Sequence, residues 1–95
     1  MNHNEKPLKE VLREFVEVYR LKGKLNQYRL IDRWEPVVGK VIAKHTKGLS
    51  INRKTLYVEM DSSIVRNEVY LLKSMIIEEL NKGFGEKIID HIVFK

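Results

Sequence analysis

Cysteine is absent from this sequence of 95 residues. The chain therefore has no disulfide framework, no thiolate zinc site and no cysteine nucleophile. It also lacks an uninterrupted apolar run of the roughly 20 residues that a membrane-spanning helix needs, and residues 1–7 lack the apolar segment of a signal peptide. We expect a cytoplasmic protein without a membrane anchor, in which a flexible segment (residues 1–7) precedes a single domain (residues 8–95).

Motifs of enzymes and of cofactor sites are also lacking. Gly39-Lys40 has neither the upstream glycine loop nor the following Ser or Thr of a P-loop. Ser62 and Ser63 are expected to cap a helix rather than to act as nucleophiles. The histidines have no metal-ligand spacing, being at His3, His45 and His91. We expect no catalytic activity, no metal, no cofactor and no small-molecule substrate, and we interpret His45 as a helix-end or half-buried polar residue.

Positive charge is unevenly distributed along the chain. Residues 1–54 carry 13 Lys and Arg against 6 Asp and Glu, whereas residues 55–95 carry 5 against 7, and the net charge is +5. Such an asymmetry is typical of proteins that bind a polyanion, most often nucleic acid. The alternative is a solvated charged surface that keeps a small protein soluble.

Three helices are predicted in the first half of the chain. Apolar residues recur at helical spacing over residues 8–21, and Gly23 is expected to end this helix in a left-handed conformation. A second helix is predicted over residues 26–34. A third follows from Pro36 to about His45, with Gly39 inside it, where we expect close packing of another element.

The second half is predicted to hold strands and one long helix. Gly48 opens a strand over residues 49–52, a turn follows at residues 52–54, and a return strand covers residues 55–60, with Tyr57 on its outer face. A helix with a wide buried apolar stripe is predicted from Asp61 to Lys82, and a last strand over residues 88–94. The order is ααα-ββ-α-β, an α+β fold with a three-stranded sheet packed on the long helix.

Several short patterns together resemble the DciA-like family, the bacterial replicative-helicase operator family that was long catalogued as a domain of unknown function. The patterns cover nearly the whole chain and are Trp34-x-x-Val37-Val38-Gly39-x-x-Ile42-Ala43-x-His45-Thr46, Leu56-Tyr57-Val58, Ser62-Ser63-x-x-Arg66-Asn67-Glu68, Leu80-Asn81, Gly85 and Ile89-x-x-Ile92-Val93. The resemblance implies a KH-like fold, DNA binding and a role in placing a DnaB-type replicative helicase on DNA. The Gly-x-x-Gly loop of true KH domains is missing.

We therefore predict a non-enzymatic accessory domain that binds DNA non-specifically, with single-stranded or forked DNA favoured over a specific duplex site. The predicted contact residues are Arg29, Arg33, Lys40, Lys44, Lys47, Arg53, Lys54 and Tyr57. Family-motif residues with a structural or partner-facing role are Trp34, Gly39, His45, Thr46, Arg66, Asn67 and Glu68. Trp34 is expected in the core, and Arg66-Asn67-Glu68 is expected either to bond to the hairpin or to face a partner.

Two other functions share the charge signature. A protein-interaction adaptor would use the basic face to dock an acidic partner, and its N-terminal helix could dock a partner instead of completing the core. A binder of structured RNA would carry the same basic residues. DNA affinity should fall steeply with salt, whereas docking through an apolar face should tolerate salt.

Overall fold

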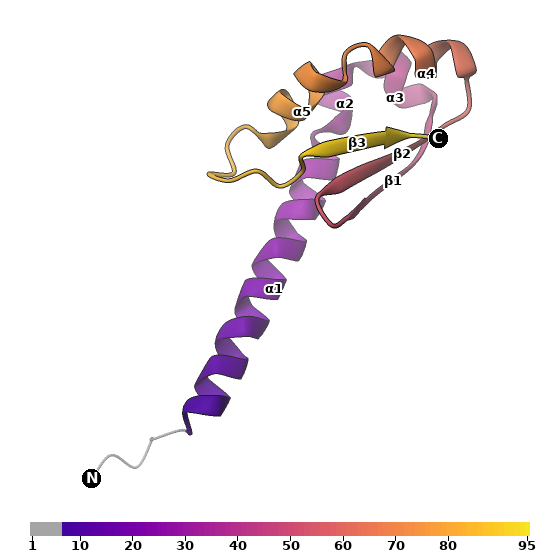
Figure 1. Cartoon of the computed structure of the whole chain (residues 1–95). Coiled ribbons are helices and arrows are strands. Elements are labelled where there is room, and N and C mark those ends of the chain that lie inside the picture. The colour runs from indigo at the N-terminus through magenta and orange to yellow at the C-terminus, as the bar shows by residue number, and fades with distance from the viewer. Residues whose placement is uncertain (1–6) are drawn as a thin grey trace.

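The computed structural model describes residues 7–95 and contains a long helical arm attached to a small α+β body (Figure 1). The molecule measures 68 × 22 × 19 Å because the first helix projects far beyond the rest. In chain order the elements are α1 (Leu8–Asp32), α2 (Trp34–Val38), α3 (Lys40–Lys44), β1 (Thr46–Asn52), β2 (Thr55–Met60), α4 (Ser63–Tyr70), α5 (Lys73–Asn81) and β3 (His91–Phe94). The prediction of a flexible segment over residues 1–7 falls, apart from Pro7, outside the described residues.

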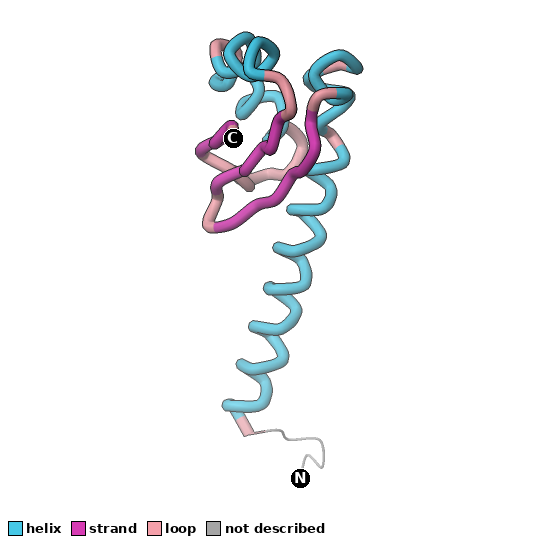
Figure 2. Tube along the Cα trace, turned by 90° about the vertical axis from the view of Figure 1, so that its right-hand side faces the viewer, coloured by secondary structure: helices cyan, strands magenta, loops and turns pink. Residues whose placement is uncertain are grey.

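α1 is one continuous helix, so the prediction of two helices separated at Gly23 is wrong. A glycine inside a helix costs only about 1 kcal/mol relative to alanine, and helical spacing of apolar residues continues on both sides of it. We call residues 8–25 the arm and residues 26–95 the body. Asn26 and Leu30 are the buried residues of α1, and they attach its last turns to the body. Seen from the side in Figure 2, the arm extends past the sheet with no other described element beside it.

The sheet has the order β1-β2-β3, with β1 antiparallel and β3 parallel to β2. β1 begins at Thr46, two residues before the predicted start at Gly48, and its register shifts between these two residues. β3 begins at His91, later than predicted. The reason is that the backbone N–H groups of Ile88 and Ile89 donate to Oδ1 of Asn81, at 2.9 and 3.1 Å, instead of joining the ladder.

The predicted long helix is divided into α4 and α5 by a bend at residues 71–72, so the prediction of a single helix is wrong. α4 packs on β2, whereas α5 packs on β3 and α2, and the bend lets each half meet its own neighbours. The apolar stripe predicted along the middle of this helix is Val65, Val69, Leu72, Ile76 and Leu80. Val69, Ile76 and Leu80 are buried as predicted and Val65 is half-buried, but Leu72, at the bend, is 44 % exposed. Four flanking residues were expected to be buried as well. Ile77 is half-buried against the core, but Ile64, Leu71 and Met75 are exposed because no second described element covers α4 and α5 on that side.

The core lies between the sheet and the helices that cover one of its faces. Trp34 is only 3 % exposed, which confirms its predicted place in the core. The other buried apolar residues are Leu30, Leu56, Val58, Met60, Val69, Ile76, Leu80, Ile88, Ile89 and Ile92. The α+β class with a three-stranded sheet is confirmed, and the arrangement is compatible with the KH-like label. Among the described residues, none of the helices has the length and apolar character needed to cross a membrane.

Candidate nucleic-acid interface

Arg53 and Lys54 form the tip of the β1–β2 hairpin, and we refer to these two residues as the tip. They are the whole connection, since Asn52 pairs with Thr55 on either side of them. Both have left-handed backbones, with φ of 50° and 62°. Two-residue hairpin loops favour this geometry, but they favour Asn-Gly in it, because a left-handed backbone costs other residues roughly 1–2 kcal/mol each. Two long basic side chains are thus held in solvent where the turn itself would prefer smaller residues.

The tip is fixed by the start of β3. The carbonyl oxygen of Lys54 accepts hydrogen bonds from the backbone N–H groups of Asp90 and His91, at 2.9 and 3.3 Å. The turn is therefore supported by the sheet on two sides, and its direction is set by backbone bonds that do not use the basic side chains.

A second group of basic residues lies at the other end of the hairpin. Lys40 and Lys44 are exposed and four residues apart on α3, so they share one side of that helix. Lys47 follows at the start of β1. We refer to these three lysines as the α3 cluster. Since β1 is seven residues long, roughly 20 Å separate this cluster from the tip.

The surroundings of Gly39, directly before the α3 cluster, differ from the prediction. It is not inside a helix but joins α2 to α3, with φ 88° and ψ 169°, a conformation that only glycine adopts readily. No atom lies within 4 Å of the place where a Cβ would stand. The expectation of close packing at Gly39 is therefore wrong, and the glycine is required by backbone conformation alone.

His45 and Thr46 connect α3 to the sheet. Nδ1 of His45 lies 2.8 Å from Oδ1 of Asp61, and Nζ of Lys47 lies 3.1 Å from Oδ2 of the same carboxylate. The hydrogen bond with His45 and then that with Lys47 hold the pKa of Asp61 below its usual value. Indole Nε1 of Trp34 donates to Oγ1 of Thr46 at 3.0 Å. The position of His45 at the C-terminal end of α3, half-buried, agrees with its prediction as a helix-end polar residue.

The outer face of the sheet lies between the two basic groups. Tyr57 is on this face, in register with Ser50 on β1 and Val93 on β3, and it is half-buried. Nζ of Lys95 lies 5.0 Å from the centroid of the Tyr57 ring, within the range of a cation–π contact. A shallow hollow of about 260 Å³ lies here, and its lining includes Tyr57, Lys95 and Glu59. This face offers one aromatic ring and one ammonium beside a carboxylate.

Arg29 and Arg33, which were predicted to flank the phosphate contacts, have different environments. Arg29 is exposed in the last turn of α1. Arg33 donates from its two terminal nitrogens to the carbonyl oxygens of Lys82 and Glu79, at 2.9 and 2.7 Å, and lies over the ring of Phe84. These bonds satisfy carbonyls at the end of α5. The guanidinium of Arg33 is therefore occupied, and we leave it out of the proposed contact set.

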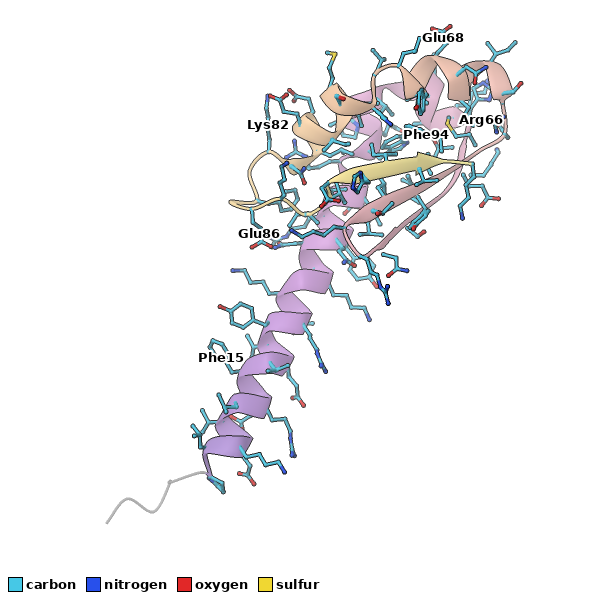
Figure 3. The ribbon with its side chains drawn as sticks, in the orientation of Figure 1. Phe15, Arg66, Glu68, Lys82, Glu86 and Phe94 are labelled. Carbon is cyan, nitrogen blue, oxygen red and sulfur yellow. The ribbon has the colours of Figure 1, made fainter. Side chains whose placement is uncertain are left out.

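Arg66, Asn67 and Glu68 lie on α4, and Figure 3 shows Glu68 pointing away from the sheet. Hydrogen bonds from these side chains to the hairpin were one of the two predicted roles. Within residues 7–95 none is present, and Asn67 and Glu68 are exposed. The cap of this helix is Ser62, as predicted, whose Oγ accepts from the N–H of Val65 at 3.2 Å. Of the two roles, the partner-facing one is compatible with this exposure.

Two residues with clear roles were missing from the predicted set. Lys95 was overlooked, although it continues the period-two pattern of Val93 on the outer face. Asn81 was noted only as part of a pattern, and its side chain holds the α5–β3 connection, since Nδ2 also donates to the carbonyl oxygen of Ile89 at 2.8 Å. No sequence signal distinguishes an asparagine that fastens a loop from one that simply ends a helix.

Comparison with known proteins complements this geometry. The family model described as "Dna[CI] antecedent, DciA" matches residues 7–94. The chain belongs to the DciA family. This confirms the predicted resemblance. The family has a role related to loading of the DnaB helicase, and it is not a family of catalysts. No curated protein matches the chain. Within the described residues, no three His, Asp or Glu side chains lie close enough together to hold a metal ion.

Proposed function

We propose that this DciA-family chain assists the loading of a DnaB-type helicase by holding DNA non-specifically through the tip and the α3 cluster. Lysine and arginine side chains on an exposed surface contact phosphates without reading sequence. Tyr57, on the outer face between the two basic groups, provides a ring on which an unpaired base can stack. Single-stranded or forked DNA is therefore the expected ligand.

The observation that carries this proposal is the backbone of Arg53 and Lys54. A hairpin selected only for stability would have Asn-Gly in these left-handed positions. Unfavourable backbone conformations tend to persist where they serve function. Basic side chains at a projecting tip, about 20 Å from a second basic group, suit a ligand whose charges are spread along a strand.

The test uses the fact that the residues that would stabilise this turn are uncharged, whereas the residues present are basic. The double variant Arg53→Asn/Lys54→Gly removes both charges and supplies the preferred turn. We expect a higher Tm, a weaker affinity for labelled single-stranded and forked DNA measured by fluorescence anisotropy, and a log–log salt slope that is smaller by roughly 1.5, since each phosphate contact contributes about 0.7–0.9. Stability and binding therefore move in opposite directions, which simple misfolding cannot imitate.

A matched control removes two charges elsewhere on the body. Lys73→Gln/Lys87→Gln changes the net charge by the same amount, on α5 and in the α5–β3 connection, and should leave both the affinity and the salt slope nearly unchanged. If both double variants lost the same amount of DNA affinity, only the net charge of the protein would matter for binding, and the tip would have no specific role.

The helicase part of the proposal needs its own measurement. Loading of a DnaB-type hexamer onto circular single-stranded DNA, followed by unwinding, should be stimulated by the wild-type chain and less so by the Asn-Gly variant. Stimulation that is unchanged by the variant would favour the adaptor function, in which the basic surface docks an acidic protein. Tighter binding to structured RNA than to any DNA would favour the RNA-binding alternative.

A further inference from the structure

An apolar stripe that nothing in the described chain covers runs along the arm and into the next turn of α1. The residues on its central line follow one another at steps of three and four along α1 and are each at least 46 % exposed; they are Leu8, Val11, Phe15, Val18, Leu21, Leu25 and Tyr28. Leu12, Val16 and Tyr19 are exposed as well and widen the stripe on one side. Figure 3 shows Phe15 pointing into open space beside the arm. Steps of three and four are the spacing with which one helix packs along another. An isolated helix gains little stability in water without such packing.

The order of the steps makes the central line of the stripe complementary to itself. Along the chain they read 3, 4, 3, 3, 4, 3, which is the same in both directions, with Val18 at the centre. Two antiparallel copies of the arm crossing at Val18 therefore place Leu8 at the level of Tyr28, Val11 at the level of Leu25 and Phe15 at the level of Leu21. A two-fold interface requires this kind of self-complementarity.

Charge along the arm also favours the antiparallel arrangement. Glu10, Glu14 and Glu17 lie in the N-terminal half of the helix, whereas residues 20–29 contain only basic charges, from Arg20, Lys22, Lys24 and Arg29. Lys9 and Arg13 also lie in the N-terminal half, which keeps a net charge of −1 over residues 8–19. Antiparallel pairing brings this half alongside the basic half of the other copy, with Glu14 at the level of Lys22. Parallel pairing would align four basic residues with four basic residues, which is repulsive.

The body leaves room for this partner. Successive residues of an α-helix are rotated by roughly 100°. Asn26 and Leu30 face the body, and they lie roughly 100° and 140° around the helix from Leu25. The stripe therefore passes the body on another side of α1, and a second helix can run beside the whole arm.

We infer that two copies of this chain associate through antiparallel arms, with the two-fold axis at Val18. This inference rests on the arm alone and does not depend on the proposed function. The stripes of two copies bury on the order of 1,000 Å² in total, at the lower end of specific interfaces. The dimer is therefore expected to form in the micromolar range.

Sedimentation equilibrium of the full chain between about 1 and 500 µM tests the association. Wild type should pass from monomer to dimer across this range. Val18→Asp places two carboxylates at the two-fold axis and should raise the dissociation constant at least 100-fold. Ile64→Asp is the matched control, since Ile64 is exposed to a similar extent but lies on α4, and it should dimerise like wild type. Circular dichroism checks that both variants keep their helices.

The absence of cysteine makes the orientation testable. A mixture of Leu8→Cys and Tyr28→Cys chains should give the mixed disulfide under mild oxidation, with little Leu8→Cys homodimer. Predominant Leu8→Cys homodimer would indicate parallel arms and overturn the inference. A wild-type chain that stays monomeric at 500 µM, or a dimer that Val18→Asp does not weaken, would overturn it too. If the wild-type chain were monomeric and Val18→Asp still reduced its stimulation of the helicase, the dimer would be ruled out and the apolar stripe would instead be a surface that binds the helicase.

Discussion

The arm and the body are built from the same kind of amphipathic helix, but they bury it to different extents. Ile76 and Leu80 on α5 are four residues apart and at most 6 % exposed, because the sheet covers them. Leu21 and Leu25 on the arm have the same spacing and are 62 % and 47 % exposed. The spacing of apolar residues thus determines that a helix forms and which side is apolar. It does not determine whether the covering surface belongs to the same chain.

Trp34→Ala should give the largest effect and would reveal how strongly the body depends on one side chain. Removing a buried tryptophan costs about 3–5 kcal/mol in the free energy of unfolding, here together with its hydrogen bond to Thr46. Chemical denaturation measures the change. Leu12→Ala on the arm, where the side chain is 54 % exposed, should change stability by less than about 0.5 kcal/mol. Similar losses for the two variants would remove the distinction between arm and body.

Arg33→Ala comes next and tests how the joint between α1 and α2 is fastened to α5 within the body. The guanidinium donates to two carbonyl oxygens at the end of α5, and hydrogen bonds from a charged group contribute about 1.5–3 kcal/mol. Arg33→Lys should not restore the loss, because an ammonium cannot reproduce the fork of a guanidinium. The control is Arg29→Ala, one helical turn earlier and exposed, which should remain near wild type in the same denaturation experiment.

Two glycines should respond with opposite signs to substitution by alanine. At neither position would an added Cβ lie within 4 Å of an atom outside the adjoining backbone, so the backbone conformation alone decides the effect. Gly39→Ala in the body forces alanine to φ 88° and should cost about 1–3 kcal/mol. Gly23→Ala in the arm improves helix propensity and should raise stability by up to about 1 kcal/mol. Thermal unfolding followed by circular dichroism at about 222 nm measures the change in stability of both variants. If Gly39→Ala were stabilising, the backbone conformation described for Gly39 between α2 and α3 would be wrong.

The smallest expected effect is a pH dependence that belongs to the body. The pKa of Asp61 is lowered from 3.8 by its hydrogen bonds with His45 and Lys47. A carboxylate whose pKa is lowered by folding stabilises the folded state at any pH above its unfolded-state pKa. This contribution is lost as the pH falls through the folded-state pKa. Asp61→Asn should therefore lower Tm at neutral pH, and the difference from wild type should shrink below about pH 4. A difference in Tm that stays the same below about pH 4 would contradict this role of Asp61.

The sequence was a good guide to elements whose surroundings are local and a poor one where distant contacts decide. The hairpin, the Ser62 cap, the buried Trp34 and the α+β class all follow from spacing and turn chemistry. The bend at residues 71–72 arises because α4 and α5 have different neighbours in the sheet. Spacing within one helix carries no information about these neighbours.

The candidate site shows the same division. The basic residues and the outward position of Tyr57 could be predicted from composition and from the alternation of the strand. The role of Arg33 could not, because its partners at Glu79 and Lys82 are more than forty residues away in the chain. The separation of the tip from the α3 cluster likewise depends on the length and direction of β1, which place the two at opposite ends of the hairpin.

The different connections of the three strands have a consequence for the order of folding. β1 and β2 are joined by two residues, and such a hairpin can close within microseconds. β3 pairs with β2 only after the segment 61–90 has been brought together, which is a slower, non-local step. The left-handed tip therefore belongs to the element expected to form first. Its unfavourable backbone should slow the folding reaction more than it speeds unfolding.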